Sequence, residues 1–211
     1  FLNNIVPLAN GSHEQAQIYS VKDGALSVEL KNGSVVGLAE SEKFSGYRGS
    51  EDTPDAVLFV NNGLHFEIEI ERSGLIGKDD AAGINGIIME SAVTTIIDLE
   101  DSVAVVDAED KVTAYRNWLG LMKGDLEDTF EKGRKTQTRR LNPDRTYTAP
   151  DGSEFSLPGR SLMMVRNMSP LMTIAAVQDA NGNQIPECIL DGMTTVAIAV
   201  HDLKRTGPFQ N

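Results

Sequence analysis

Alternating hydrophobic and polar positions dominate the first third of the chain. Every second residue over 26–30 is hydrophobic, and an Asp-Gly and an Asn-Gly dipeptide, which favour tight hairpin turns, flank this stretch. The same period of two returns over 64–70, where histidine and glutamate occupy the intervening positions. This pattern is typical of a sheet with one face in solvent. We therefore predict that residues 1 to about 72 are rich in β-strands.

The pattern changes after this β-rich part. A helix is predicted over Asp79–Ser91, although Gly83 and Gly86 each lower helix stability by about 1 kcal/mol relative to alanine. Residues 93–97 are β-branched and nearly all apolar, which favours a strand buried on both faces of a parallel sheet.

Two strand-helix units are predicted from this point onward. A helix is expected over Asp107–Met122, because the aspartate can cap it and acidic residues fill its first turn. The second unit has a strand over 161–165 and a helix that begins near Pro186. β-branched residues over 194–200 would also suit a strand, but hydrophobic residues recur there at steps of three and four, which favours a helix.

A polar stretch, Gly124–Gly159, separates the two strand-helix units. It has turn signals but no helical period, and we interpret it as part of the β-rich lobe, inserted into a βα fold. The predicted fold class is α/β. The β-rich inserted α/β domain comprises residues 1–92 and 124–161, and the two βα units comprise residues 93–123 and 162–211.

Composition excludes several classes of partner. The net charge of −12 opposes binding to nucleic acid and to anionic membranes. No apolar run approaches the ~20 residues that span a bilayer. The chain has one cysteine, Cys188, so an internal disulfide and a multi-cysteine metal site are excluded, in keeping with a reducing compartment. We expect a cytoplasmic protein without nucleic-acid or membrane partners.

Charged residues follow both predicted parallel strands. Asp98, Glu100 and Asp101 end the first strand, and carboxylates at this density often serve Mg²⁺, directly or through its water shell. Capping of local structure explains them equally well. Arg166 ends the second strand, where a guanidinium could bind a carboxylate through two hydrogen bonds. A structural ion pair with the acidic residues is the alternative, and the residues alone favour it.

A basic run stands out in this acidic chain. A polyphosphate ligand such as coenzyme A would suit it, although solvated loop charge is the commoner reason for such a run. The chain lacks a glycine-rich phosphate-binding loop. The basic residues are Lys132, Arg134, Lys135, Arg139, Arg140 and Arg145.

Several stretches resemble malate synthase G. The most specific are Thr95–Lys111, Tyr115–Gly120, Leu141–Arg145 and Gly159–Ser161. Weaker similarity extends from Phe1–Leu8 through Asn62–His65 to Ile189–Gly192, so the resemblance covers essentially the whole chain. It identifies the chain as an internal segment of that enzyme, expected to be inactive alone.

The resemblance implies a (β/α)8 TIM-type barrel with an inserted α/β domain. The implied acyltransferase condenses acetyl-CoA with glyoxylate and water to give malate and free coenzyme A, in the glyoxylate bypass of the tricarboxylic acid cycle. Mg²⁺ polarises the glyoxylate, an aspartate removes a proton from the acetyl methyl group, and the enolate attacks the aldehyde before the thioester is hydrolysed. The full-length enzyme is expected to be a cytoplasmic monomer.

The resemblance also implies roles for individual residues. Arg166 matches the catalytic arginine, which binds glyoxylate and stabilises charge on the enolate oxygen. Ser102 and Arg139 match residues that contact acetyl-CoA. The direct Mg²⁺ ligands and the catalytic aspartate are expected outside this segment. A supporting acidic motif beside the metal comprises Asp98, Glu100 and Asp101.

Two other functions stay open from the sequence. The chain could belong to another Mg²⁺-dependent acyl-CoA lyase or aldolase on a related barrel, although the insert between the βα units argues against this. It could also be a binding domain without chemistry of its own. Residues 167–171 depart from the malate synthase G pattern, in which a Gly-His pair precedes the leucine.

Overall fold

The structure is a computed structural model that describes residues 1–90, 94–101, 103–133 and 135–204. The chain divides into two compact units. The first is Phe1–Ser91 with Asp144–Leu157, and the second is Ala92–Pro143 with Pro158–Asn211. Residues 124–143 thus group with the second unit, whereas the sequence pattern placed them in the β-rich lobe.

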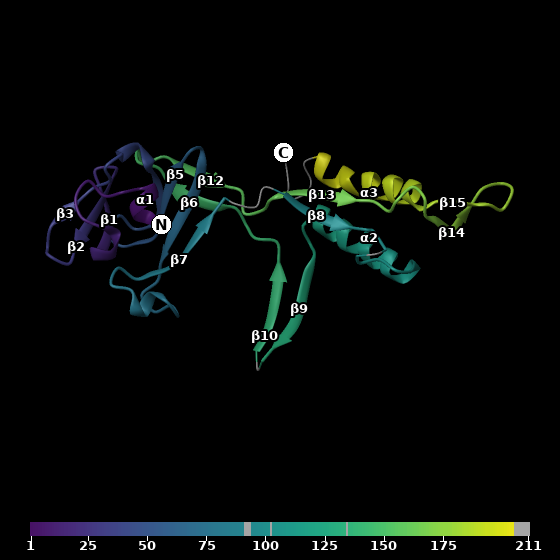
Figure 1. Ribbon diagram of the computed structural model, residues 1–211, viewed down its shortest axis with the longest axis horizontal. Coiled ribbons are helices and arrows are strands. Elements are labelled where there is room, and N and C mark those ends of the chain that lie inside the picture. Colours follow the sequence, from purple (N-terminus) through teal and green to yellow (C-terminus); the bar gives the residue numbers. More distant parts are fainter. Residues whose placement is uncertain (91–93, 102, 134, 205–211) are drawn as a thin grey trace. The chain divides into compact units, whose positions relative to one another are not determined.

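The first unit is built almost entirely from antiparallel strands (Figure 1). One sheet has three strands in the order β1-β2-β3, and the other has six in the order β12-β11-β4-β5-β6-β7. The β-rich character predicted for the first 72 residues is confirmed. The elements are α1 (Leu2–Ile5), β1 (Ala16–Lys22), β2 (Ala25–Leu30), β3 (Val35–Val36), β4 (Phe44–Gly49), β5 (Pro54–Asn61), β6 (Leu64–Ile70), β7 (Ile84–Met89), β11 (Arg145–Thr148) and β12 (Glu154–Leu157), with short 3-10 turns at His13–Gln15, Ser41–Lys43 and Gly77–Asp79.

Local sequence accounts for the hairpin between β1 and β2. Asp23 and Gly24 both have positive φ, 51° and 73°, which matches the twist that a two-residue hairpin turn requires. The hydrophobic residues of β2, spaced by two, are buried. Both sheets contribute to the core, whose most buried members include Val28, Val57, Phe59 and Ile68.

The predicted helix over Asp79–Ser91 is wrong. A 3-10 turn ends at Asp79, and the segment then forms β7, which pairs antiparallel with β6 at the edge of the larger sheet; Ser91 lies outside the described residues. Gly83 lies at φ +79°, a left-handed conformation that ends any helix, and the isoleucines that follow it suit a strand.

One position on the predicted solvent face of β6 is buried. Glu67 is 2% exposed, and its carboxylate accepts hydrogen bonds from Arg145 Nη1 at 2.7 Å and from Tyr147 Oη at 2.6 Å. Both partners lie on β11, which comes from a distant part of the chain. The charged pair joins this second segment to the sheet.

The described residues of the second unit form one parallel strand pair, two long helices and two hairpins (Figure 1). Both predicted strand-helix units are present. The hairpin of β14 and β15 was not anticipated from the sequence. The elements are β8 (Thr94–Asp98), α2 (Ala108–Lys123), β9 (Glu127–Lys132), β10 (Lys135–Arg140), β13 (Leu162–Arg166), β14 (Thr173–Gln178), β15 (Gln184–Pro186) and α3 (Glu187–Leu203).

The ends of α2 follow from its sequence. Asp107 accepts hydrogen bonds from the backbone N–H groups of Glu109 and Asp110, so it is the predicted cap. Gly124 ends the helix in the left-handed conformation. Trp118 is buried against α3, where its indole N–H donates to the Thr195 carbonyl oxygen at 3.0 Å.

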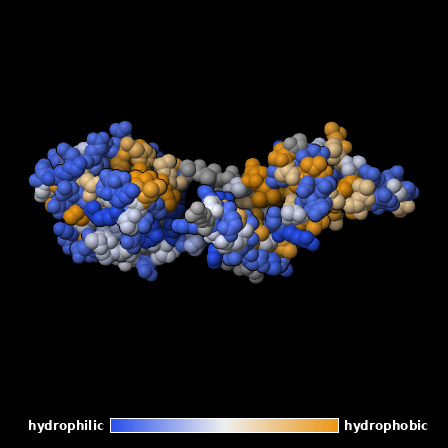
Figure 2. All heavy atoms as spheres, turned by 90° about the horizontal axis from the view of Figure 1, so that it is seen from below, coloured by the Kyte–Doolittle hydropathy of each residue, from blue (hydrophilic) through white to orange (hydrophobic). Residues whose placement is uncertain are grey.

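Much hydrophobic surface of the second unit is exposed. Met193 of α3 is 71% exposed, and Ile96, Leu162 and Met164 of the strand pair are each about half exposed. Figure 2 shows patches of hydrophobic side chains on the face of this unit that is in view. Within the described residues, no helix is long and apolar enough to cross a membrane.

Candidate functional site

The ends of the two strands that carry Asp98 and Arg166 lie side by side. Strands β8 and β13 are parallel, and their register pairs Asp98 with Arg166. Arg166 donates from Nε to Asp98 Oδ1 at 2.9 Å, and its Nη2 lies 2.8 Å from Asp98 Oδ2. This is the ion pair that the sequence offered as the alternative role of Arg166. It is a two-pronged pair of the kind that fixes a guanidinium in direction.

The electrostatics of this pair are set by hydrogen bonding. The Arg166 guanidinium and then the backbone N–H of Glu100 hold the pKa of Asp98 below its usual range. Because both bonds are made to the charged form, Asp98 is an anion at neutral pH. The Glu100 N–H donates to Asp98 Oδ1 at 3.0 Å, so Asp98 also caps the turn that follows β8.

Arg166 retains capacity for a ligand. Its side chain is 53% exposed. A guanidinium has five N–H donors, and two of the Arg166 donors are directed at Asp98. Asp98 therefore holds one side of the Arg166 guanidinium, and the other side is open to a ligand.

The acidic motif does not form a metal shell by itself. Both oxygens of Asp98 face Arg166, whereas Asp101 lines a cavity to which Asp98 does not contribute. In the parts of the chain that the structure describes, no group of three or more acidic, histidine or cysteine residues could hold a metal ion. These residues alone do not fit the near-octahedral oxygen shell of Mg²⁺.

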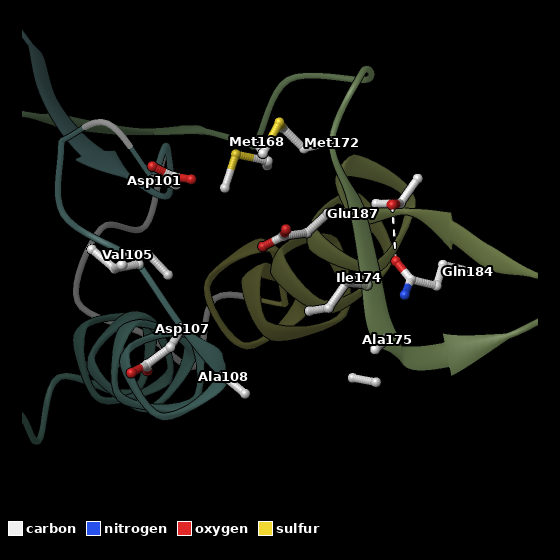
Figure 3. Close-up of a pocket in the computed structure, with 13 residues that line it drawn as sticks. Asp101, Val105, Asp107, Ala108, Met168, Met172, Ile174, Ala175, Gln184 and Glu187 are labelled. Carbon is white, nitrogen blue, oxygen red and sulfur yellow. Dashed lines mark hydrogen bonds between the residues drawn. The ribbon is translucent and has the colours of Figure 1, made fainter.

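A cavity of about 620 Å³ lies beside the loops that follow β8 and β13 (Figure 3). Its walls are polar and hydrophobic in about equal measure, and Figure 3 shows Met168 and Met172 above the Glu187 carboxylate. The lining residues are Asp101, Val105, Val106, Asp107, Ala108, Met168, Met172, Thr173, Ile174, Ala175, Ala176, Gln184 and Glu187.

Glu187 of the cavity wall also belongs to a buried charged cluster that was not predicted from the sequence. Lys111 Nζ lies 2.5 Å from Glu187 Oε1 and 3.0 Å from Asp191 Oδ1. Tyr115 Oη donates to Asp191 Oδ1 at 2.5 Å, and burial together with this bond raises the pKa of Tyr115, so the tyrosine stays protonated. The sequence held one indication of this cluster. Lys111 and Tyr115 on α2 are four positions apart, as are Glu187 and Asp191 on α3, so each pair lies on one face of its helix.

Comparison with known proteins identifies the chain. The family model for "Malate synthase G, alpha-beta insertion domain" matches residues 1–61. A malate synthase G of Halalkalibacterium halodurans is 52% identical over 211 residues, which is 100% of this chain and 29% of that relative. The chain belongs to the malate synthase G family.

Two further malate synthase G proteins support the assignment. That of Corynebacterium efficiens is 42% identical over 95% of this chain and 26% of its own length. That of Corynebacterium glutamicum is 40% identical over 100% of this chain and 28% of its own length. The chain thus spans less than a third of the length of these relatives.

The malate synthase G resemblance matches two residues, Ser102 and Arg139, to acetyl-CoA contacts. Ser102 lies outside the described residues, and so does Arg134 of the basic run. Arg139 is exposed on β10, where its guanidinium lies 4.7 Å from the centroid of the Phe130 ring. The β9-β10 hairpin also carries Lys132, Lys135 and Arg140.

Arg145, the last residue of the basic run, has a different environment. It lies in the first unit and pairs with the buried Glu67 at 2.7 Å. Arg145 therefore forms an ion pair within a sheet. It is not one of the solvated loop charges that were considered for the basic run.

Proposed function

We propose that this segment carries part of the active site of a malate synthase. The enzyme would condense acetyl-CoA with glyoxylate and water to give malate and free coenzyme A, through a Claisen-type condensation followed by thioester hydrolysis. The single observation that carries the proposal is the fixed, half-exposed guanidinium of Arg166 at a strand end, in a chain 52% identical to a malate synthase G.

The environment of Arg166 suits the role proposed for it. Glyoxylate carries a carboxylate, and the open side of the guanidinium can donate two parallel hydrogen bonds to a planar acceptor. The enolate of acetyl-CoA develops negative charge on one oxygen, which a cation held in place can stabilise without reorganising. Asp98 holds the cation in place, because it accepts hydrogen bonds from the side of the guanidinium that faces away from the ligand.

We propose that the two strand-helix units are part of a (β/α)8 barrel. The pairing of β8 with β13 is parallel, and their carboxyl ends meet at one edge, where barrel enzymes place their catalytic residues. One face of the pair exposes Ile96, Leu162 and Met164. Side chains of this kind fill the interior of a barrel, so the exposure supports a fold with more strands.

Further properties follow from the proposed reaction. We propose that it depends on Mg²⁺, held by carboxylates outside this segment, so the segment alone is inactive. Ser102 and Arg139 are proposed to contact acetyl-CoA. The excess of acidic residues supports an enzyme without nucleic-acid or membrane partners, and we propose that the full-length enzyme is cytoplasmic and monomeric.

The test is Arg166→Lys in a full-length malate synthase G that contains this segment. Turnover at saturating acetyl-CoA and glyoxylate should fall by ~10²- to 10³-fold, because a single ammonium cannot reproduce the fork of the guanidinium. The KM for acetyl-CoA should change much less.

A matched control tests whether the effect depends on the position of the arginine at the strand end. Arg116 is exposed on α2, so Arg116→Lys makes the same chemical change away from the strand end and should leave turnover unaltered. Thermal melts of both variants establish that they are folded. Near-normal turnover in a well-folded Arg166→Lys enzyme would reduce Arg166 to a structural ion pair.

A further inference from the structure

Asp191 is the centre of the buried charged cluster, and its side chain is fully buried. Oδ1 accepts hydrogen bonds from Tyr115 Oη at 2.5 Å and Lys111 Nζ at 3.0 Å. Oδ2 accepts from the backbone N–H of Met168 at 2.8 Å and from Lys111 Nζ at 3.2 Å. The carboxylate therefore holds two side chains of α2 and one backbone group of a loop at the same time.

The loop held in this way is the one that leaves the Arg166 strand end. Met168 is two residues beyond Arg166, and the Arg166 carbonyl oxygen accepts from the Leu99 N–H at 2.9 Å. Lys111 Nζ lies 3.5 Å from the Leu99 carbonyl oxygen. The backbone on both sides of the Asp98–Arg166 ion pair is thus tied to the same buried lysine and aspartate.

Packing of the two helices alone does not explain this arrangement. A buried ion pair often gains nothing over hydrophobic residues of similar size, so it is weak evidence of a purely stabilising role. Helix α3 buries Asp191 and Thr195 while it exposes Met193. A carboxylate that accepts from a backbone N–H does what a hydrophobic side chain cannot, because it fixes the position of the main chain.

We propose that Asp191 is a positioning residue, which fixes the backbone after β13 and thereby the direction in which the Arg166 guanidinium leaves the strand end. Lys111 and Tyr115 hold the carboxylate in place. The inference rests on the proposed function for the catalytic role of Arg166, but the fixing of the loop is a property of this chain and is measured without any reaction.

The first test is amide hydrogen exchange of the 211-residue chain with Asp191→Ala. Alanine removes both carboxylate oxygens, so the Met168 N–H loses its acceptor whatever the local rearrangement. Exchange at Met168 should become about tenfold faster, or more, relative to the central amides of α2 and α3.

Tyr115→Phe is the matched control. It removes a hydrogen bond to the same carboxylate but leaves Oδ2 facing Met168, so the Met168 amide should keep its protection relative to the helices. If Asp191→Ala does not fold, the triple variant with Lys111→Met and Glu187→Gln, in which no buried charge is left without a partner, takes its place. Unchanged relative exchange at Met168 in the folded aspartate variant would overturn the proposal.

The second test is a double-mutant cycle on turnover in the full-length enzyme. Asp191→Ala should lower kcat about tenfold or more, because small errors in the direction of a catalytic group are costly. In the Arg166→Lys background it should lower kcat no further, since the group that it positions is already gone. The same fold loss in both backgrounds would show a general structural role and refute positioning.

Failure of the proposed function has a different signature. If Arg166→Lys alone turns over normally, the catalytic role of Arg166 is refuted, and with it the catalytic part of this inference. The exchange of the Met168 amide still decides whether Asp191 fixes the loop.

Discussion

Replacing Lys111 with methionine should strongly destabilise the second unit. Lys111 is 3% exposed and lies between two carboxylates, Glu187 at 2.5 Å and Asp191 at 3.0 Å. Methionine matches the length of the lysine stem but leaves the two buried carboxylates without a cation. The attraction between unit charges 3.0 Å apart is about 5.5 kcal/mol at an effective dielectric constant of 20.

Desolvation offsets a large part of that attraction in the native protein. The expected loss in the free energy of unfolding is therefore about 3–5 kcal/mol, the range found when one partner of a buried pair is removed. With a urea slope of about 2 kcal/mol per molar, the midpoint of unfolding should move down by about 2 M.

Trp118 provides the assay. It is the only tryptophan of the chain and is buried between α2 and α3, so its fluorescence reports on this unit. Lys123→Met is the control on the same helix, where an exposed pair with Asp125 at 3.0 Å should contribute little. A midpoint shift for Lys111→Met no larger than that of Lys123→Met would refute the reasoning.

Three further outcomes are expected. Glu67→Gln should lower the free energy of unfolding of the first unit by about 3 kcal/mol, measured by thermal melt, because it breaks a buried ion pair. Arg166→Met should raise the pKa of Asp98 toward its usual value in a carboxyl-carbon NMR titration. In the unaltered chain the depressed pKa stabilises the fold above the unfolded-state value, and this contribution is lost as pH falls through the folded-state value. Gly24→Ala should destabilise more than Gly33→Ala in urea titrations. Both glycines have positive φ, which costs alanine about 1–2 kcal/mol, but only at Gly24 would the added carbon meet a backbone oxygen, at 2.1 Å.

Features decided by a few neighbouring residues were predictable from the sequence. The cap of α2 at Asp107 needs only the two N–H groups that follow it, and the turn at Asp23-Gly24 needs only its own backbone angles. The helix over Asp79–Ser91 was predicted wrongly because its residues fit either period. Pairing with the edge of β6 decided the outcome, and that pairing is not encoded in the segment itself.

Long-range contacts limited how much of the site could be predicted from the sequence. Asp98 and Arg166 are 68 residues apart, yet each was recognisable as a charge at the end of an apolar strand. Lys111 and Asp191 are 80 residues apart on helices that read as ordinary amphipathic segments, so their pairing was invisible. Burial of Glu67 likewise depends on a partner 78 residues away.

The side of α3 that packs in this unit is not its most hydrophobic side. Asp191 and Thr195 are buried, whereas Ile189, Met193 and Val196 are exposed. Burying a carboxylate while exposing hydrophobic side chains is unfavourable unless the carboxylate is fully bonded and the hydrophobic side chains have another partner. The first condition is met by Lys111, Tyr115 and Met168. The second would be met in the proposed barrel, where each helix also packs against its neighbours, so the exposed stripe and the bonded aspartate both fit that proposal.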